Sequence, residues 1–231
     1  MGSRHDELRI VLVGKTGGGK TFIRNKLLDK PTDRDIRRGE CDGQKLALIN
    51  TPGVYSRKMT EHKVQQAIAK CMIHAQPGPH VFLYVAGPMP FTQEDYDAMK
   101  IIQNIFGPKS KDHTLVVFCA KNKPRDVPDI ESEFRGGYYL FDGNDESSKP
   151  RSELLEKIME LVQKNEGKHY TNEAFKEAQK VIEKEREKRK PDTGSDDMMC
   201  ELIEALLKAF MGDTYAGLIN ALTDFLVPGK K

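Results

Sequence analysis

The feature that most constrains this chain is a short apolar run that leads directly into a glycine-rich loop and then a helix. Residues 8–13 have the composition of a buried strand, residues 14–21 follow the pattern GxxxxGK[ST], and residues 20–28 have helical periodicity. Glycines let the backbone amides curl inward towards phosphate oxygens, and the following helix offers its positive end. This order of strand, loop and helix predicts a phosphate-binding loop at the start of an α/β fold.

Each residue type in this loop has an expected task. The Lys20 ammonium would reach the outer phosphates as a point charge, and the Thr21 hydroxyl would ligate Mg²⁺. The other expected nucleotide-binding residues of the loop are Lys15, Thr16, Gly17, Gly18 and Gly19. The alternative is a glycine-rich turn without a ligand, and the position of the motif in the first strand-to-helix turn argues against it.

Short apolar runs alternate with segments of helical period along most of the chain. The expected strands are residues 8–13, 45–49, 80–86, 114–119 and 138–141, and the expected helices are residues 20–28, 60–74, 92–106 and 151–164. Residues 34–40 are expected to form a hairpin with 45–49, turned at residues 41–43. The pattern predicts a three-layer α/β domain whose sheet is mostly parallel with one antiparallel hairpin.

A second phosphate-side element is expected at Asn50-Thr51-Pro52-Gly53, directly after the strand at 45–49. GTPases place D-x-x-G here, where the Asp holds Mg²⁺ through water and the Gly amide senses the γ-phosphate. Asn50 keeps a carbonyl acceptor of similar shape but lacks the negative charge, so we expect it to hold Mg²⁺ weakly and Gly53 to contact the γ-phosphate. A simple turn without function is the alternative.

The sequence changes character after residue 165. We expect residues 1–165 to form the phosphate-binding domain, residues 166–190 a charged helical extension, and residues 198–228 two amphipathic helices. Residues 191–195 have the composition of a linker. The apolar faces at 198–228 could pack on the domain, dimerise or lie on a membrane, and their acidic and mixed polar faces disfavour anionic lipid.

Composition excludes several classes of protein. A net charge of +2 over 231 residues gives no sign of a nucleic-acid-binding surface. Four widely spaced cysteines argue against a disulfide framework and against structural zinc. No secretory signal and no uninterrupted membrane-spanning apolar run are visible, so we expect a cytoplasmic protein.

Several segments resemble one family, the GTPases of immunity-associated proteins. The opening at residues 8–17 and the segment Asn50-Thr51-Pro52-Gly53-Val54-Tyr55 are similar to that family's first two motifs. Residues 69–71, 77–80 and 91–95 resemble the family's conserved box, and residues 165–173 resemble the end of its G domain. The resemblance implies a G domain that binds GTP or GDP with Mg²⁺, self-association as a homodimer or homo-oligomer, and peripheral contact with intracellular membranes.

The chain departs from the family where guanine is read. The family's base-reading R-K-x-D is Ala120-Lys121-Asn122-Lys123 here, so the Asp that accepts hydrogen bonds from guanine is replaced by a donor. Lys121 is still expected to lie along the base. In the last base loop, Asp142 could accept from guanine N1 and N2 and partly repair the loss.

These observations predict a guanine-nucleotide-binding switch or scaffold of the GTPase type with weak hydrolysis at most. Val54, Tyr55 and Ser56 follow Gly53, so no glutamine there positions an attacking water. Two alternatives stay open at this point. One is a pseudo-GTPase that binds no nucleotide and serves as an interaction module, and the other is a P-loop nucleotide hydrolase with relaxed base specificity.

Overall fold

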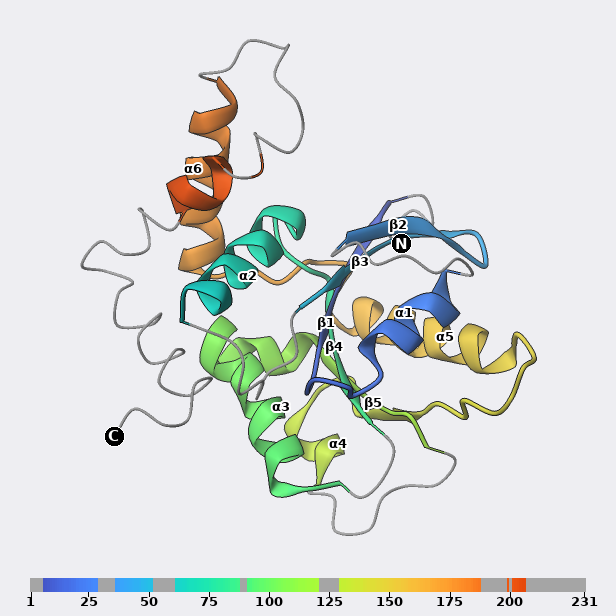
Figure 1. Ribbon diagram of the computed structural model, residues 1–231. Coiled ribbons are helices and arrows are strands. Elements are labelled where there is room, and N and C mark those ends of the chain that lie inside the picture. Colours follow the sequence, from blue (N-terminus) through green and yellow to red (C-terminus); the bar gives the residue numbers. More distant parts are fainter. Residues whose placement is uncertain are drawn as a thin grey trace.

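The fold is a six-stranded sheet with helices on both faces, as seen in a computed structural model (Figure 1). The structure describes residues 6–28, 36–51, 61–87, 91–120, 129–187, 199 and 201–206. The strand order is β2-β3-β1-β4-β5-β6. The strands are β1 (Leu8–Val13), β2 (Ile36–Cys41), β3 (Gln44–Asn50), β4 (Val81–Ala86), β5 (Thr114–Phe118) and β6 (Tyr138–Leu140). All neighbouring strands run parallel except β2 and β3, which confirms the predicted sheet.

The single hairpin turns at Asp42 and Gly43. Both residues have positive φ, 47° and 81°, which is the two-residue turn geometry that matches the twist of the flanking strands. Glycine adopts this conformation without cost, and Asp tolerates it better than most residues. The hairpin places β2 at the edge of the sheet and β3 beside β1, so the end of β3 lies next to the loop that follows β1.

The period-two pattern of the strands separates two apolar cores. In β1, Ile10 and Leu12 face one core, and Val11 and Val13 face the other. The helices that cover the sheet are α1 (Lys20–Leu27), α2 (Glu61–His74), α3 (Gln93–Phe106), α5 (Lys149–Lys164) and α6 (Glu173–Glu187). Figure 1 shows α1 and α5 on one face of the sheet and α2, α3 and α6 on the other.

Two short elements were not predicted from the sequence, the 3₁₀ helix η1 (Pro108–His113) and α4 (Ile130–Glu133). Neither is long enough to show a hydrophobic period. The helices expected at 60–74, 92–106 and 151–164 are confirmed to within two residues at each end.

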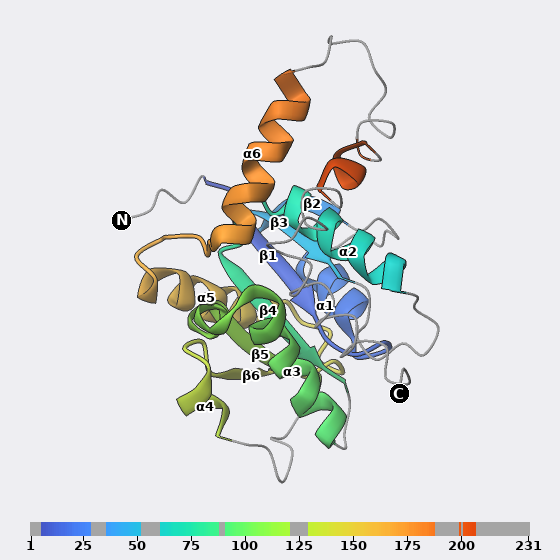
Figure 2. The same cartoon turned by 90° about the vertical axis from the view of Figure 1, so that its left-hand side faces the viewer.

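The described residues beyond 165 include helix α6 and residues 201–206, which pack on the face that α2 and α3 cover. Phe175, Ala178 and Ile182 of α6 are buried in the same core cluster as Phe82 of β4. Leu202, Ile203 and Leu206 from the helical residues 201–206 belong to that cluster as well. Figure 2 shows α6 extending past the edge of the sheet with residues 201–206 beside it. None of the described helices is long and apolar enough to cross a membrane.

Candidate nucleotide-binding site

The loop after β1 lies across the carboxyl ends of two neighbouring strands. Gly14 has φ of 151°, and a Cβ there would collide with the Val85 carbonyl oxygen at the end of β4. Gly19 has φ of 93°, and a Cβ there would lie 2.9 Å from Cys119 Sγ, just after β5. Only glycine fits both positions, because the backbone approaches its neighbours too closely for any side chain. The glycines therefore set the path of the loop.

Lys20 is the centre of this loop. Its ammonium donates to the carbonyl oxygens of Gly14 and Lys15, both at 2.8 Å, and its side chain is only 7% exposed. Burial lowers the pKa of Lys20 from its ordinary value of 10.5 to about 8. Within the described residues these two neutral carbonyls are its recorded partners, so the buried cation is not matched by a carboxylate.

The two predicted metal-side oxygens are present at the same end of the sheet. Thr21 is exposed in the first turn of α1. Asn50 ends β3 opposite Leu12 of β1, and its Oδ1 is buried without a hydrogen-bond donor from the described part of the chain. The next residue is fixed, since the Thr51 amide and hydroxyl both donate to the Leu12 carbonyl, at 3.1 and 2.7 Å. An orphaned buried acceptor fits an oxygen that would accept from a metal-bound water.

Lys15 connects the loop to α3. Its ammonium donates to Asp95 Oδ2 at 2.9 Å and to the Thr92 hydroxyl at 3.3 Å. The same Asp95 oxygen accepts from the Thr92 amide at 2.9 Å and from the Thr92 hydroxyl at 2.6 Å, which caps the start of α3. The Asp95 side chain is 5% exposed. The side chain of Lys15 is therefore held by the protein, while its carbonyl accepts from Lys20.

The predicted base-side residue Asp142 lies in the loop after β6. Its Oδ1 accepts from the Asn144 amide at 3.0 Å, which fixes the carboxylate in a local turn. The preceding residue, Phe141, is buried and packs edge to face against Phe22 of α1, with ring centroids 5.8 Å apart. This contact brings the loop after β6 to the first turn of α1, directly behind the phosphate loop.

The structure thus brings the described site residues to one edge of the sheet. Lys15 to Thr21, Asn50 and Asp142 all lie at or just beyond the carboxyl ends of their strands, where open α/β sheets bind ligands. Gly53 and Lys121 lie outside the described residues, as does Lys123, which stands in place of the guanine-reading Asp.

Three of the described histidines, His80, His113 and His169, lie at the opposite edge of the sheet from the site. His80 precedes β4 and His113 precedes β5, at the amino ends of their strands. His80 Nδ1 accepts from the Arg9 amide at 3.0 Å, and burial together with nearby Arg9 lowers the pKa of His80 to about 3. Burial also lowers the pKa values of His113 and His169. These three histidines are packed and neutral.

Sequence reasoning missed two residues at the site. Asp95 was not among the predicted site residues, because nothing local links it to a lysine 80 positions away. Phe22 was not predicted either, since it lies within the expected helix at residues 20–28. An aromatic residue directly after the Thr of the phosphate loop is the signal that could have drawn attention to it.

Comparison with known proteins identifies the family of this chain. The model of the AIG1 family matches residues 8–189. The chain is 24% identical over 221 residues to immune-associated nucleotide-binding protein 9 of Arabidopsis thaliana, covering 81% of this chain and 65% of that protein. It is 27% identical over 195 residues to GTPase IMAP family member 8 of Homo sapiens, covering 72% of this chain and 29% of that protein. The chain therefore spans less than two thirds of the length of these relatives.

A solved structure shares the fold. The cytosolic domain of the T. maritima FeoB iron transporter, in its GMPPNP form, is similar with a TM-score of 0.51 at 16% identity, covering 94% of this chain and 86% of that chain. At this identity the likeness concerns the fold alone. The family resemblance expected from the motifs is confirmed by the match over residues 8–189 of the 231, and the chain belongs to the AIG1 family.

Proposed function

We propose that this chain binds a guanine nucleotide with Mg²⁺ and acts as a switch or scaffold with slow hydrolysis at most. The observation that carries the proposal is the buried Lys20 ammonium, which is 7% exposed and bonded to two neutral carbonyls. Burying a cation without an anion is costly, so such a group favours an anionic ligand. A phosphate in the loop would supply that anion.

The surroundings of Lys20 suit a polyphosphate. Backbone amides at the start of α1 add the positive end of the helix dipole. Relatives that match this chain are named nucleotide-binding proteins and GTPases, which supports the same ligand class. A diphosphate or triphosphate chain would run from the loop towards the strand ends on the β5 and β6 side.

Mg²⁺ fits the residues present, though they would hold it weakly. Thr21 would offer its hydroxyl to the metal, and the buried Asn50 Oδ1 would accept from a metal-bound water. When bound, the metal would neutralise charge on the outer phosphates. Both protein oxygens are neutral, so most of the opposing charge must come from the nucleotide itself.

Slow turnover follows from the same residues. Asn50 cannot provide the negative charge that an Asp gives to the metal shell, and Val54, Tyr55 and Ser56 offer no amide side chain to orient water. We propose that nucleotide occupancy, rather than rapid hydrolysis, controls the protein, and that G domains of two chains associate when loaded.

Base selectivity separates this proposal from its nearest alternative. Lys123 replaces the usual guanine-reading Asp. Asp142 offers a carboxylate in the loop after β6, at the end of the sheet where we propose that the base lies. If Asp142 reads guanine, GTP binds better than ATP. If it does not, the protein is a P-loop nucleotide-binding protein of relaxed base specificity.

The test is calorimetric titration of the purified protein with GDP and GTP in Mg²⁺, repeated with ATP as competitor. We expect binding of GTP and GDP, and loss of binding by at least about a hundredfold in Lys20→Ala, because a paired buried charge contributes several kcal/mol. Lys157→Ala on α5 is the matched control, since this lysine is exposed and its ion-pair partner in the described part of the chain is Glu160.

The outcomes of this titration distinguish the proposed function from its two alternatives. Absence of binding at high micromolar nucleotide would make the chain a pseudo-GTPase. Equal competition by ATP would remove the guanine claim and leave a phosphate-anchored nucleotide site. Full binding by Lys20→Ala would place the site elsewhere in the molecule.

A further inference from the structure

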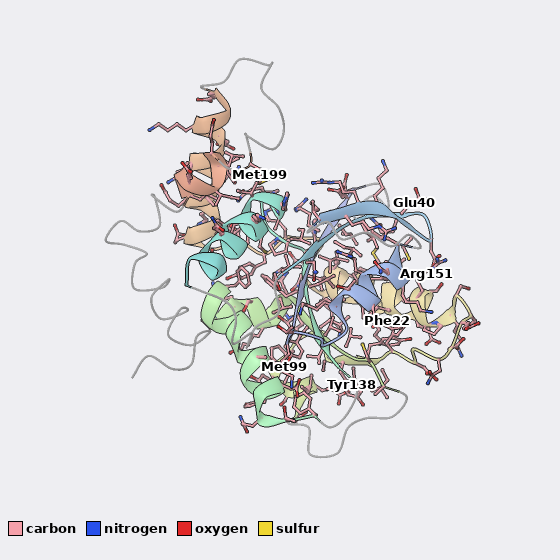
Figure 3. All side chains as sticks on the ribbon, in the orientation of Figure 1. Phe22, Glu40, Met99, Tyr138, Arg151 and Met199 are labelled. Carbon is pink, nitrogen blue, oxygen red and sulfur yellow. The ribbon has the colours of Figure 1, made fainter. Side chains whose placement is uncertain are left out.

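Phe22 is an unusual residue in its position. It follows Thr21 directly, in the first turn of α1, and is 38% exposed. Among the residues whose side chains the structure describes, it is the one large apolar side chain that is exposed. Figure 3 labels it on α1. Leaving part of an aromatic ring in water has a free-energy cost, and we ask what this exposed ring could contact.

The ring is held firmly at its edges. It meets Phe141 at an interplanar angle of 88° with centroids 5.8 Å apart. A Cβ at Gly143 would lie 3.2 Å from Phe22 Cζ, so a glycine at this point makes room for the ring. Lys26 Nζ, one turn further along α1, lies 5.6 Å from the ring centroid. The ring is therefore already ordered before any ligand arrives.

Phe22 also bridges the two halves of the proposed site. The residues before it form the phosphate loop, and its contacts with Phe141 and Gly143 reach the loop that carries Asp142. A nucleotide with its phosphates on Lys20 and its base towards the ends of β5 and β6 must pass this ring. The aromatic ring thus lies between the part of the site that holds phosphates and the part that faces the base.

We propose that Phe22 is a stacking platform for the nucleotide base, and that it supplies base affinity in place of the missing guanine-reading Asp. This inference rests on the proposed nucleotide binding. Every nucleobase has a π face, so stacking strengthens binding without choosing the base. Phe22 therefore sets how tightly a nucleoside polyphosphate binds, and preference for guanine is left to hydrogen bonds such as those of Asp142. The ring by itself would therefore strengthen binding of any nucleoside polyphosphate, ATP included.

The experiment compares three ligands by calorimetry, GTP, ATP and inorganic tripolyphosphate, on wild-type protein and on three variants of Phe22. Phe22→Ala should weaken GTP and ATP by the same factor, about tenfold or more, and leave tripolyphosphate unchanged because it has no base. Phe22→Tyr should keep wild-type affinity, since it retains the π face. Phe22→Leu fills similar space against Phe141 without a flat ring, so it should behave like Phe22→Ala.

The thermal midpoint of each variant without ligand checks that the fold is kept, and tripolyphosphate binding checks that the phosphate loop is intact. An unchanged or tighter nucleotide affinity in Phe22→Ala would overturn the platform, the latter because the ring would be blocking the base position. Equal loss of tripolyphosphate binding would also overturn it, since the ring would then act on the loop. If wild-type protein binds GTP and ATP no more tightly than tripolyphosphate, the stacking platform is ruled out while phosphate binding stands. If it binds none of the three ligands, the proposed function is ruled out as well.

Discussion

At the scale of single residues, the burial of Lys20 makes a prediction about pH. Burial lowers the pKa of this ammonium to about 8, so the free protein loses the charge above that pH. A triphosphate attracts the charged form. Its affinity should be nearly constant up to about pH 7, fall about twofold by pH 8, and then fall by up to about tenfold per pH unit, because each further unit lowers the charged fraction of Lys20 about tenfold. Calorimetry of GTP binding across this range measures the effect.

The same pKa shift predicts the stability of the free protein. The unfolded chain keeps the proton up to about the ordinary pKa of 10.5, while the folded chain releases it above about 8. The unfolded state therefore binds more protons in this window, and the free energy of unfolding rises with pH there relative to Lys20→Met. Below pH 8 the penalty for the buried charge is complete and constant. Affinity that stays flat to about pH 9.5, with no difference in stability slope from Lys20→Met, would contradict a lowered Lys20 pKa.

At the scale of elements, the ion pair between Lys15 and Asp95 joins the phosphate loop to the start of α3. Because the Asp95 side chain is 5% exposed, water and salt screen the pair poorly. A double-mutant cycle with Lys15→Met and Asp95→Asn should give a coupling energy of about 1–3 kcal/mol in urea unfolding. Each single change should cost stability, since it leaves the other partner without its ion pair.

The exposed pair Lys149–Glu153 on α5 is the control for this cycle. Its atoms are 3.7 Å apart and its side chains are 72% and 45% exposed, so its coupling should stay below about 1 kcal/mol. Equal couplings for both pairs would mean that the Lys15–Asp95 contact is only a surface pair. Persistence of the coupling at about 1 M salt would instead support a shielded link between loop and helix.

The elements also show what sequence could and could not predict. Strands such as β4, whose six residues are all buried, have continuous apolar runs and were found from composition alone. The phosphate loop can be predicted because all of its residues lie close together in the sequence, within one strand, one loop and the first turn of one helix. The Lys15–Asp95 pair and the Phe22–Phe141 contact join segments that lie far apart in the chain, so no local period reveals them. The elements η1 and α4 are too short to show a hydrophobic period in the sequence.

At the scale of the whole molecule, a series of aromatic contacts joins helix α6 to the sheet. Phe175 of α6 stacks on Phe106 of α3 with centroids 6.0 Å apart, and Phe106 lies 4.6 Å from Phe82 of β4. The ring of Tyr170 packs edge to face against Phe82 and Phe175, with centroid distances of 5.4 and 6.1 Å. Such contacts add to the stability gained from burial. A helix anchored this way should unfold together with the sheet.

Phe175→Ala tests that coupling across the molecule. The ring is fully buried, so its removal should lower the free energy of unfolding by about 3–5 kcal/mol and the thermal midpoint by about 10 °C. Circular dichroism and tyrosine fluorescence should still report one coincident transition, because α6 shares its core with β4. Lys176→Ala, at the exposed neighbouring position, should change stability by less than about 0.5 kcal/mol. Two separate transitions in Phe175→Ala, with the main midpoint unchanged, would instead mean that α6 is an appendage whose packing does not support the nucleotide-binding fold.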